Sequence, residues 1–170
     1  MKGAWLEVIL LLVMVDKVLK KRIGEILIED GCLTPEDLQK GLEYQKTQGN
    51  GMLIGQILIK MGFLTEESLV GAIGKQLEIP YLPLALYSIN TEAAVSMSAE
   101  FCRKNLLIIF DQDEKHVFIS TADPLNDTAI DEIKTKTKLK PQVFVSTPSE
   151  IYSMQEIIFA AANPDMKKAG

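Results

Sequence analysis

The chain carries one unit twice, RIGEILIEDGCLTPEDLQKGLEYQ at Arg22–Gln45 and LIGQILIKMGFLTEESLVGAIGKQ at Leu53–Gln76. The copies align without a gap, and glycines, leucines, a threonine and a closing glutamine recur at matching places. Such repetition indicates two supersecondary units that bury their apolar faces together. The informative difference lies at the head of the unit, where Leu53 stands in the place of Arg22.

Each copy predicts a pair of short helices. Gly31 and Gly62 supply the left-handed residue that ends the first helix of each pair. Thr34 and Thr65 are N-caps for the second helix, and Pro35 occupies the favoured first helical position. We therefore expect a helical tandem-repeat subdomain over residues 21–87.

An apolar segment, AWLEVILLLVMV at residues 4–15, precedes the repeats. It is shorter than the roughly 20 apolar residues that cross a bilayer. We predict an apolar helix over residues 1–20 that docks on another subunit, through which the chain self-associates. A signal peptide is the weaker alternative, because the basic start is limited to Lys2 and the amino terminus.

The composition changes after the repeats, in the proline-containing segment LEIPYLPL at residues 77–84. Pro80 and Pro83 favour an extended connector, and we place the subdomain boundary near Ser88. The remainder alternates helical and β-rich runs, so the predicted fold class is α+β. The predicted elements after the boundary are helix 91–105, strands 106–110 and 115–121, a helix capped by Asn126, strand 141–146 and helix 149–161. They form a small subdomain of about three strands packed with helices over 88–162, and 163–170 is a frayed tail.

Composition narrows the function. Acidic residues outnumber basic ones by 23 to 18, a net charge of −5, which argues against a nucleic-acid binder. Cys32 and Cys102 are expected to be reduced core thiols of a cytoplasmic protein. His116 is the only histidine, so no His-based metal site or catalytic triad is expected.

Catalytic motifs are not found in these residues. GAIGKQ at Gly71 has the wrong spacing for a phosphate loop and lacks its hydroxyl. The acidic run at Asp111, Asp113 and Glu114 does not match a calcium loop and is interpreted as a solvated hairpin turn. The basic run from Lys134 to Lys140 is interpreted as a solvated helix end. We therefore predict that the chain is not itself an enzyme, with no metal and no cofactor.

Polar residues of the repeat suggest a ligand site. Arg22 suits a bidentate pair with a phosphate or a guanine edge. Gln45 and Gln76 each offer an amide to a base edge, and the glycines beside the first helices allow close approach to backbone N–H groups. Gly71 and Gly74 also suit close approach of a backbone or a ligand. The alternative is two helical hairpins that simply pack together, with the glutamines exposed.

Together these motifs, R-I-G-x-x-L, then G, L-T and L-x-x-Q in tandem, resemble the amino-terminal domain of type II secretion and type IV pilus assembly ATPases. This is the GspE/PilB class, called MshEN in its nucleotide-binding form. PYLPL resembles the family's connector, and ISTADPLNDTAIDEI at Ile119–Ile133 resembles its strand–A-D-P–helix segment. The resemblance covers residues 21–159.

The resemblance implies a cytoplasmic module, peripheral to the inner membrane, that docks on membrane-platform proteins and precedes a motor ATPase domain in the same chain. One branch binds cyclic di-GMP through the two motifs. Carried over by position, these are Arg22, Ile23, Gly24, Leu27, Gly31, Leu38, Leu42 and Gln45, then Leu53, Ile54, Gly55, Leu58, Gly62, Leu69, Ile73 and Gln76.

Leu53 departs from this pattern, because a full second motif carries arginine there. The loss of one charge-assisted contact would cost about 1.5–3 kcal/mol, or roughly one to two decades of affinity. Two hypotheses follow. The first is a regulatory and protein-interaction domain of a secretion or pilus motor, and the second is a cyclic di-GMP receptor.

Overall fold

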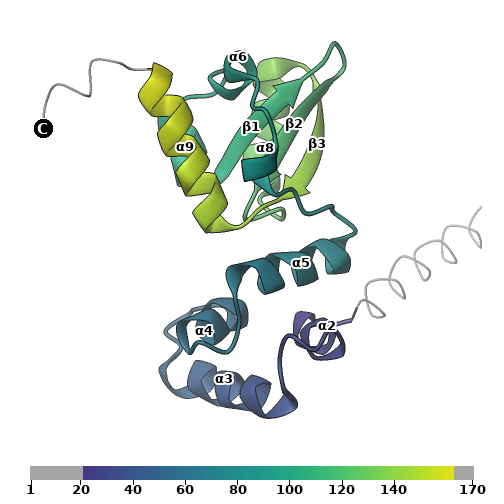
Figure 1. Ribbon diagram of the computed structural model, residues 1–170, viewed down its shortest axis with the longest axis vertical. Helices are drawn as coiled ribbons and strands as arrows, with labels where there is room; N and C mark the ends of the chain where they lie inside the picture. The colour runs from purple at the N-terminus through teal and green to yellow at the C-terminus, as the bar shows by residue number, and fades with distance from the viewer. Residues whose placement is uncertain (1–20, 163–170) are drawn as a thin grey trace, which may run out of the picture.

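The computed structural model describes residues 21–162, which form a helical part and a part built on a β-sheet (Figure 1). The α+β class predicted from the sequence is confirmed. The apolar segment 4–15 and the tail 163–170 lie outside the described residues. In the described part, no helix is long and apolar enough to cross a membrane. The helical part contains α2 (Ile23–Glu29), α3 (Pro35–Gln48), α4 (Ile54–Lys60) and α5 (Glu66–Leu77).

The helix boundaries in the repeat follow the predicted signals. Gly31 and Gly62 have φ of +70° and +74°, the left-handed region that glycine enters without steric cost. Thr34 accepts the backbone N–H of Asp37 at 3.1 Å, and Thr65 caps the second copy in the same way. Both predicted helical pairs are therefore confirmed.

The two copies pack on each other through exchanged helices. α3 contacts α4, and α2 contacts α5, so each copy's first helix packs against the second helix of the other copy. Within each copy, glycine in the first helix permits the close approach of the second helix. A Cβ on Gly24 of α2 would lie 2.8 Å from Leu38 of α3, and one on Gly55 of α4 would lie 2.8 Å from Leu69 of α5. The shared core consists of Ile26, Leu27, Leu33, Leu58, Leu64 and Ala72.

The second part is a three-stranded sheet in the order β1–β2–β3. β1 pairs antiparallel with β2 as the predicted hairpin, and β2 pairs parallel with β3 after the crossing helix α8. The elements are η1 (Leu84–Leu86), α6 (Thr91–Ala94), α7 (Ala99–Lys104), β1 (Leu107–Gln112), β2 (His116–Thr121), α8 (Asp127–Thr137), β3 (Lys140–Val145) and α9 (Pro148–Ala162).

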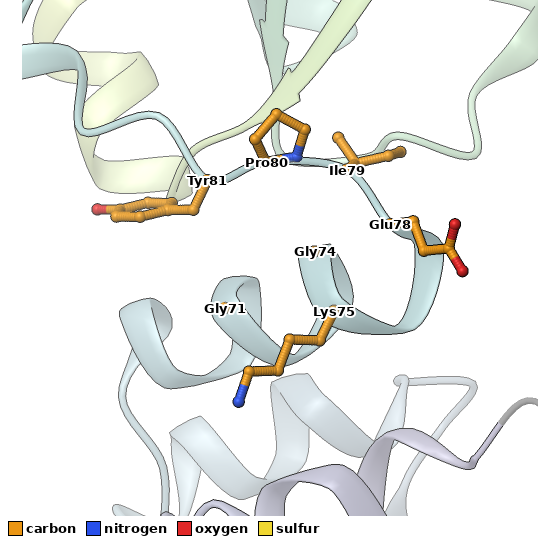
Figure 2. A pocket seen from close by; sticks show the side chains of 7 residues that line it. All are labelled: Gly71, Gly74, Lys75, Glu78, Ile79, Pro80 and Tyr81. Atoms are coloured by element: carbon orange, nitrogen blue, oxygen red, sulfur yellow. The ribbon is translucent and has the colours of Figure 1, made fainter.

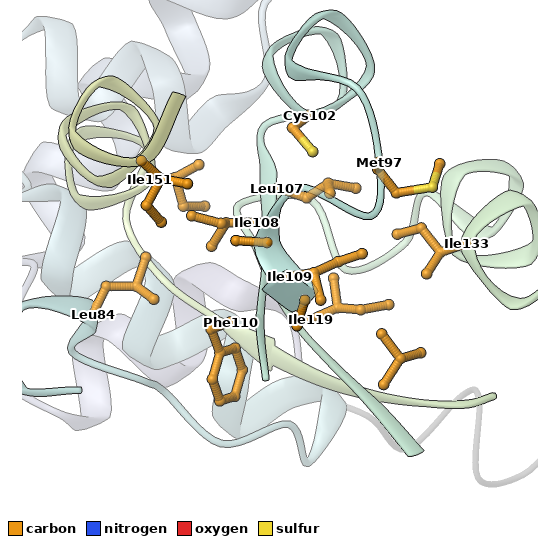
Figure 3. Close-up of a cluster of buried hydrophobic side chains, with 14 of the residues drawn as sticks. Leu84, Met97, Cys102, Leu107, Ile108, Ile109, Phe110, Ile119, Ile133 and Ile151 are labelled. Carbon is orange, nitrogen blue, oxygen red and sulfur yellow. The ribbon is translucent and has the colours of Figure 1, made fainter. Parts of the chain in front are cut away.

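Helices cover both faces of this sheet. Ile108 lies on the face covered by α9, near Ile151 (Figure 3). Ile109 and Ile119 lie on the other face, toward Ile133 of α8 (Figure 3). All five side chains are completely buried, as expected when successive residues of a strand point to opposite faces.

The single helix predicted over residues 91–105 is wrong. The segment forms α6 and α7, separated by a turn at Val95–Ser98. Ser98 accepts the N–H of Phe101 at 3.2 Å and begins a new helix, because its hydroxyl satisfies a free donor at a helix start. The apolar spacing is retained, since Ala94 and Met97 are buried in the sheet core.

One of the two cysteines was placed wrongly. Cys32 is exposed, because it follows Gly31 in the turn rather than lying on a packed helix face. Cys102 is fully buried, as predicted. Burial raises the pKa of the Cys102 thiol to about 11, so it remains protonated at neutral pH.

α5 and the connector join the helical part to the sheet. The N–H of Leu82 donates to Val145 at 2.8 Å, which adds the connector to the end of β3. Glu66, at the start of α5, accepts the N–H of Ser149 at 3.1 Å and so caps α9. Leu82 and Leu84 belong to the core around the sheet, although the predicted boundary lies further on, near Ser88.

Candidate functional site

Arg22 and Leu53, the heads of the two motifs, occupy equivalent places in the structure. Arg22 precedes α2 and Leu53 precedes α4, and both have extended backbones. Glu25 accepts the N–H of Arg22 at 3.0 Å, and Gln56 accepts that of Leu53 at 3.2 Å. The Leu53 side chain is 69% exposed. Arg22 is exposed and takes part in none of the ion pairs found within residues 21–162.

The closing glutamines form a reciprocal pair of hydrogen bonds. Gln45 Nε2 donates to the carbonyl of Met52 at 2.9 Å. Gln76 Nε2 donates to the carbonyl of Lys21, also at 2.9 Å. Each bond ends on the residue just before the head of the other motif. The glutamines were expected to present free amides to a ligand, but one donor of each amide is already used to hold a motif head.

The remaining motif positions divide by burial, and most contribute packing. Those buried in the helical core are Gly24, Leu27, Gly55 and Leu58. Those half-buried around it are Ile23, Leu38, Leu42, Ile54, Leu69 and Ile73. Gly31 and Gly62 are exposed in turns, so Arg22 is the only charged side chain that the motifs bring to the surface.

Ion pairs near the two heads are not symmetric. Lys75 of α5 contacts Asp30 after α2 at 2.6 Å, whereas Tyr44 and Met61 occupy the equivalent places of the other half. Lys21 contacts Glu29 at 2.7 Å. The bond to Glu29 raises the pKa of Lys21. The half of the site with Arg22 is therefore the more strongly charged half.

A cavity of about 420 Å³ lies between α5 and the connector. Figure 2 shows the connector passing over α5, with Lys75 pointing away from it. The two glycines of α5 differ here. A Cβ on Gly74 would lie 2.6 Å from the carbonyl oxygen of Ile79, whereas one on Gly71 would meet nothing within 4 Å. Close backbone approach is thus confirmed for Gly74 and not found for Gly71.

Tyr81 at this cavity was not singled out from the sequence. Its hydroxyl donates to Glu150 of α9 at 3.0 Å. Burial, and then the bond to Glu150, raise the pKa of Tyr81 to about 12. Its pairing spans 69 positions of the chain, so no local sequence pattern could have indicated it.

The charged clusters noted in the sequence are surface features. Asp113 accepts the N–H groups of Lys115 and His116 at 2.7 and 2.6 Å, which closes the β1–β2 turn. These bonds lower the pKa of Asp113. Lys134, Lys136, Lys138 and Lys140 are exposed around the end of α8. Within residues 21–162, no group of three or more His, Cys, Asp or Glu side chains could hold a metal ion.

The MshEN domain profile matches residues 77–165, more than half of the chain. The chain therefore belongs to the MshEN domain family. The family resemblance stated from the sequence is confirmed. The matched region begins at the end of α5, so it contains the sheet and connector rather than the repeats.

Two type IV pilus assembly ATPases named PilB are similar in sequence. The protein from Myxococcus xanthus is 25% identical over 146 residues, which cover 86% of this chain and 25% of the relative. That from Thermus thermophilus is 28% identical over 131 residues, 76% of this chain and 14% of the relative. The chain thus spans a quarter or less of the length of these relatives.

Two solved structures share the fold. The structure of MshE with cdg has a TM-score of 0.69 at 21% identity, over 82% of this chain and 99% of that one. The N-terminal domain of XpsE has a TM-score of 0.60 at 24% identity, over 79% of this chain and 92% of that one. Both matches cover most of the chain.

Proposed function

We propose that this chain is a non-catalytic regulatory and interaction domain of a type II secretion or type IV pilus motor, docking on the inner-membrane platform proteins. The observation that carries the proposal is its correspondence to a small part of much longer pilus assembly ATPases. It would work on the cytoplasmic side of the inner membrane, in cis to the motor domain.

The contacts between the two parts support a transmitting role. Glu66 on α5 caps α9 at Ser149, and Tyr81 in the connector donates to Glu150. Gly74 of α5 packs directly against the Ile79 carbonyl. A partner bound to one part would therefore act on the other through short, directional contacts rather than through a flexible linker.

Binding to purified cytoplasmic domains of the cognate platform proteins tests this proposal. Biolayer interferometry should show saturable binding with a Kd of roughly 10 μM, an affinity that regulated encounters commonly use. The untagged folded chain should compete for binding, and the heat-unfolded chain should not. The proposal fails if no platform domain binds saturably up to about 100 μM.

The second candidate function is binding of cyclic di-GMP across the two motifs, which the similarity to the structure of MshE with cdg suggests. One observation favours it: the reciprocal bonds of Gln45 and Gln76 bring the two motif heads into equivalent, fixed positions. A ligand with two similar halves suits that arrangement. Arg22 would contribute the charged contact, and Leu53 leaves the second half without one.

Isothermal titration calorimetry with cyclic di-GMP tests the second candidate. Arg22→Ala should abolish binding, since it removes the charged side chain of the site. Lys136→Ala removes an exposed charge on α8 and should leave binding unchanged. No heat at tens of micromolar protein would remove the receptor function without affecting the docking proposal.

A further inference from the structure

An aromatic pocket lies on the α9 side of the sheet, on a different part of the chain from the motif heads. Its volume is about 240 Å³. The walls come from the connector and from all three strands. The lining residues are Leu82, Tyr87, Ser88, Phe110, Asp111, Phe118 and Phe144. The proposed functions use none of them.

The rings around this pocket are inclined to one another, with Phe110 at the centre. Phe144 meets Phe110 edge-on, with centroids 5.3 Å apart and planes at 82°. Tyr87 lies 6.1 Å from Phe110 at 66°, and Phe118 lies 6.0 Å from it at 45°. Tilted rings at these distances are in direct contact and form one aromatic wall of the pocket, and an aromatic ring face attracts a cation.

The pocket is open to solvent on the side of Tyr87. Tyr87 is 51% exposed, and the preceding Leu86 is 81% exposed. Phe118 and Phe144 are half-buried on the sheet surface. Large apolar side chains left exposed together around a concavity indicate a place where a partner binds.

Asp111 is the one ionisable acidic group in the lining. Its Oδ1 accepts Asn90 Nδ2 at 3.1 Å and the N–H of Gln112 at 2.9 Å. Both bonds fix the carboxylate at the rim and use the same oxygen. Among residues 21–162, Oδ2 therefore retains its acceptor capacity for an incoming donor.

The size of the pocket decides the class of occupant. Sites for whole small molecules usually have volumes of about 300–1,000 Å³, and 240 Å³ is smaller than that range. A single large side chain fits it. Aromatic faces together with one carboxylate select a planar, weakly hydrated cation, and guanidinium combines stacking with donors for the carboxylate.

We infer that this pocket receives an arginine side chain from a protein partner, with the guanidinium against the solvent-facing aromatic surface and its N–H groups on Asp111. Arginine in an aromatic pocket is a frequent energetic centre of protein interfaces. His116 and Lys140 pair in register at the hairpin end of the same sheet, but neither lines the pocket. The positive charge of Lys140 disfavours the approach of an arginine from the hairpin end of the sheet.

The test uses the full, isotopically labelled chain and blocked amino acids as probes. N-acetyl-arginine amide should shift the amide signals of Tyr87, Asp111 and Phe118 saturably, with a Kd in the range of about 1–10 mM expected for one side chain. The citrulline analogue has the same shape without the charge, and the leucine analogue supplies only apolar contact. Each should bind roughly fivefold more weakly or worse.

Two variants test whether the carboxylate of Asp111 binds the guanidinium. Asp111→Asn keeps the acceptor for Asn90 and should weaken arginine binding roughly fivefold. Glu114→Gln removes an exposed charge in the same hairpin and should change the affinity by less than about twofold. Amide spectra confirm that both variants are folded. The inference is overturned by no binding up to about 100 mM, by equal binding of citrulline or leucine, or by an Asp111→Asn chain that binds arginine normally.

Discussion

Gln76 donates its side-chain amide to the backbone carbonyl of Lys21, 55 positions earlier in the chain, at 2.9 Å. Gln45 makes the equivalent bond to Met52. Each repeat thus holds the residue before the head of the other repeat. The two helical pairs therefore form a closed unit rather than an open stack. Removing either copy would break both of these hydrogen bonds.

Gln76→Ala should destabilise the chain by about 1 kcal/mol, since a hydrogen bond to a backbone carbonyl is lost. This corresponds to a fall in Tm of about 2–4 °C for a chain of this size. Gln45→Ala should cost a similar amount, because its bond has the same length. Thermal and urea unfolding monitored by circular dichroism measure both changes.

Gln39→Ala is the matched control for these variants. Its amide donates to Glu43 at 3.1 Å on the exposed face of α3, where water replaces the bond at little cost. We expect a change within about 0.5 kcal/mol. Alanine is a better helix former than glutamine, so an equal loss in all three variants would show that the reciprocal bonds do not set the cost.

Gly74→Ala and Gly71→Ala should have opposite effects, although both glycines lie in α5. A Cβ at position 74 would lie 2.6 Å from the Ile79 carbonyl oxygen, and the connector would have to move at a cost of about 1–3 kcal/mol. Position 71 has free space, so alanine there should stabilise the helix by about 0.5–1 kcal/mol. Urea unfolding curves of the two variants measure the difference.

The same two variants also test the contact between the helical part and the sheet. If Gly74→Ala loosens the connector, amide exchange should quicken at Leu82, whose N–H donates to Val145 at 2.8 Å, and at Val145, whose N–H donates to Pro80 at 3.0 Å. Gly71→Ala should leave exchange there unchanged. Destabilisation by both variants would contradict the free space at position 71.

The pH dependence of Tyr81 follows from its desolvation and then from its bond to Glu150. Its pKa of about 12 lies above the ordinary value of 10.0. The stability contributed by the protonated hydroxyl is therefore complete below about pH 10 and is lost as the pH rises through about 12. Ultraviolet titration should show one late-ionising tyrosine, and Tyr81→Phe should remove it.

Glu150→Gln should move the ionisation of Tyr81 to lower pH, because the neighbouring negative charge is removed while burial remains. Glu156→Gln is the control, since Glu156 pairs with Arg103 at 3.1 Å elsewhere on α9. If the pKa of Tyr81 is the same in Glu150→Gln as in the parent chain, burial alone accounts for its high value.

Local signals explain which features the sequence could predict. Gly31, Gly62, Thr34 and Thr65 act within one turn of chain, so the repeat and its helix boundaries were predictable. The turn before Ser98 was missed because the apolar spacing continues across it. Cys32 was misplaced because the exposure of a small apolar residue depends on tertiary packing.

The site was less predictable than the fold because its contacts join distant residues. The bond from Gln76 spans 55 positions, and that from Tyr81 spans 69. A motif gives the residue types at such positions but not their partners. The aromatic pocket combines a connector residue, Leu82, with Tyr87 and residues from three strands, and no periodicity links them.

Leu53→Arg should strengthen cyclic di-GMP binding if the two motifs form the proposed site. The side chain at position 53 is 69% exposed and stands at the head of α4 as Arg22 does at α2. A second charge-assisted contact of about 1.5–3 kcal/mol corresponds to roughly one to two decades of affinity. Calorimetry on the variant and the parent chain measures the gain.

Leu125→Arg provides the control, because Leu125 is 70% exposed and lies in the sheet-containing part. It adds the same charge to the chain, and its exposure matches that of Leu53, so both variants should unfold within about 0.5 kcal/mol of the parent. Only Leu53→Arg should bind the dinucleotide more tightly. An equal gain in both variants would indicate general attraction of a negatively charged ligand, and no gain in either would mean that the head of α4 does not face the ligand.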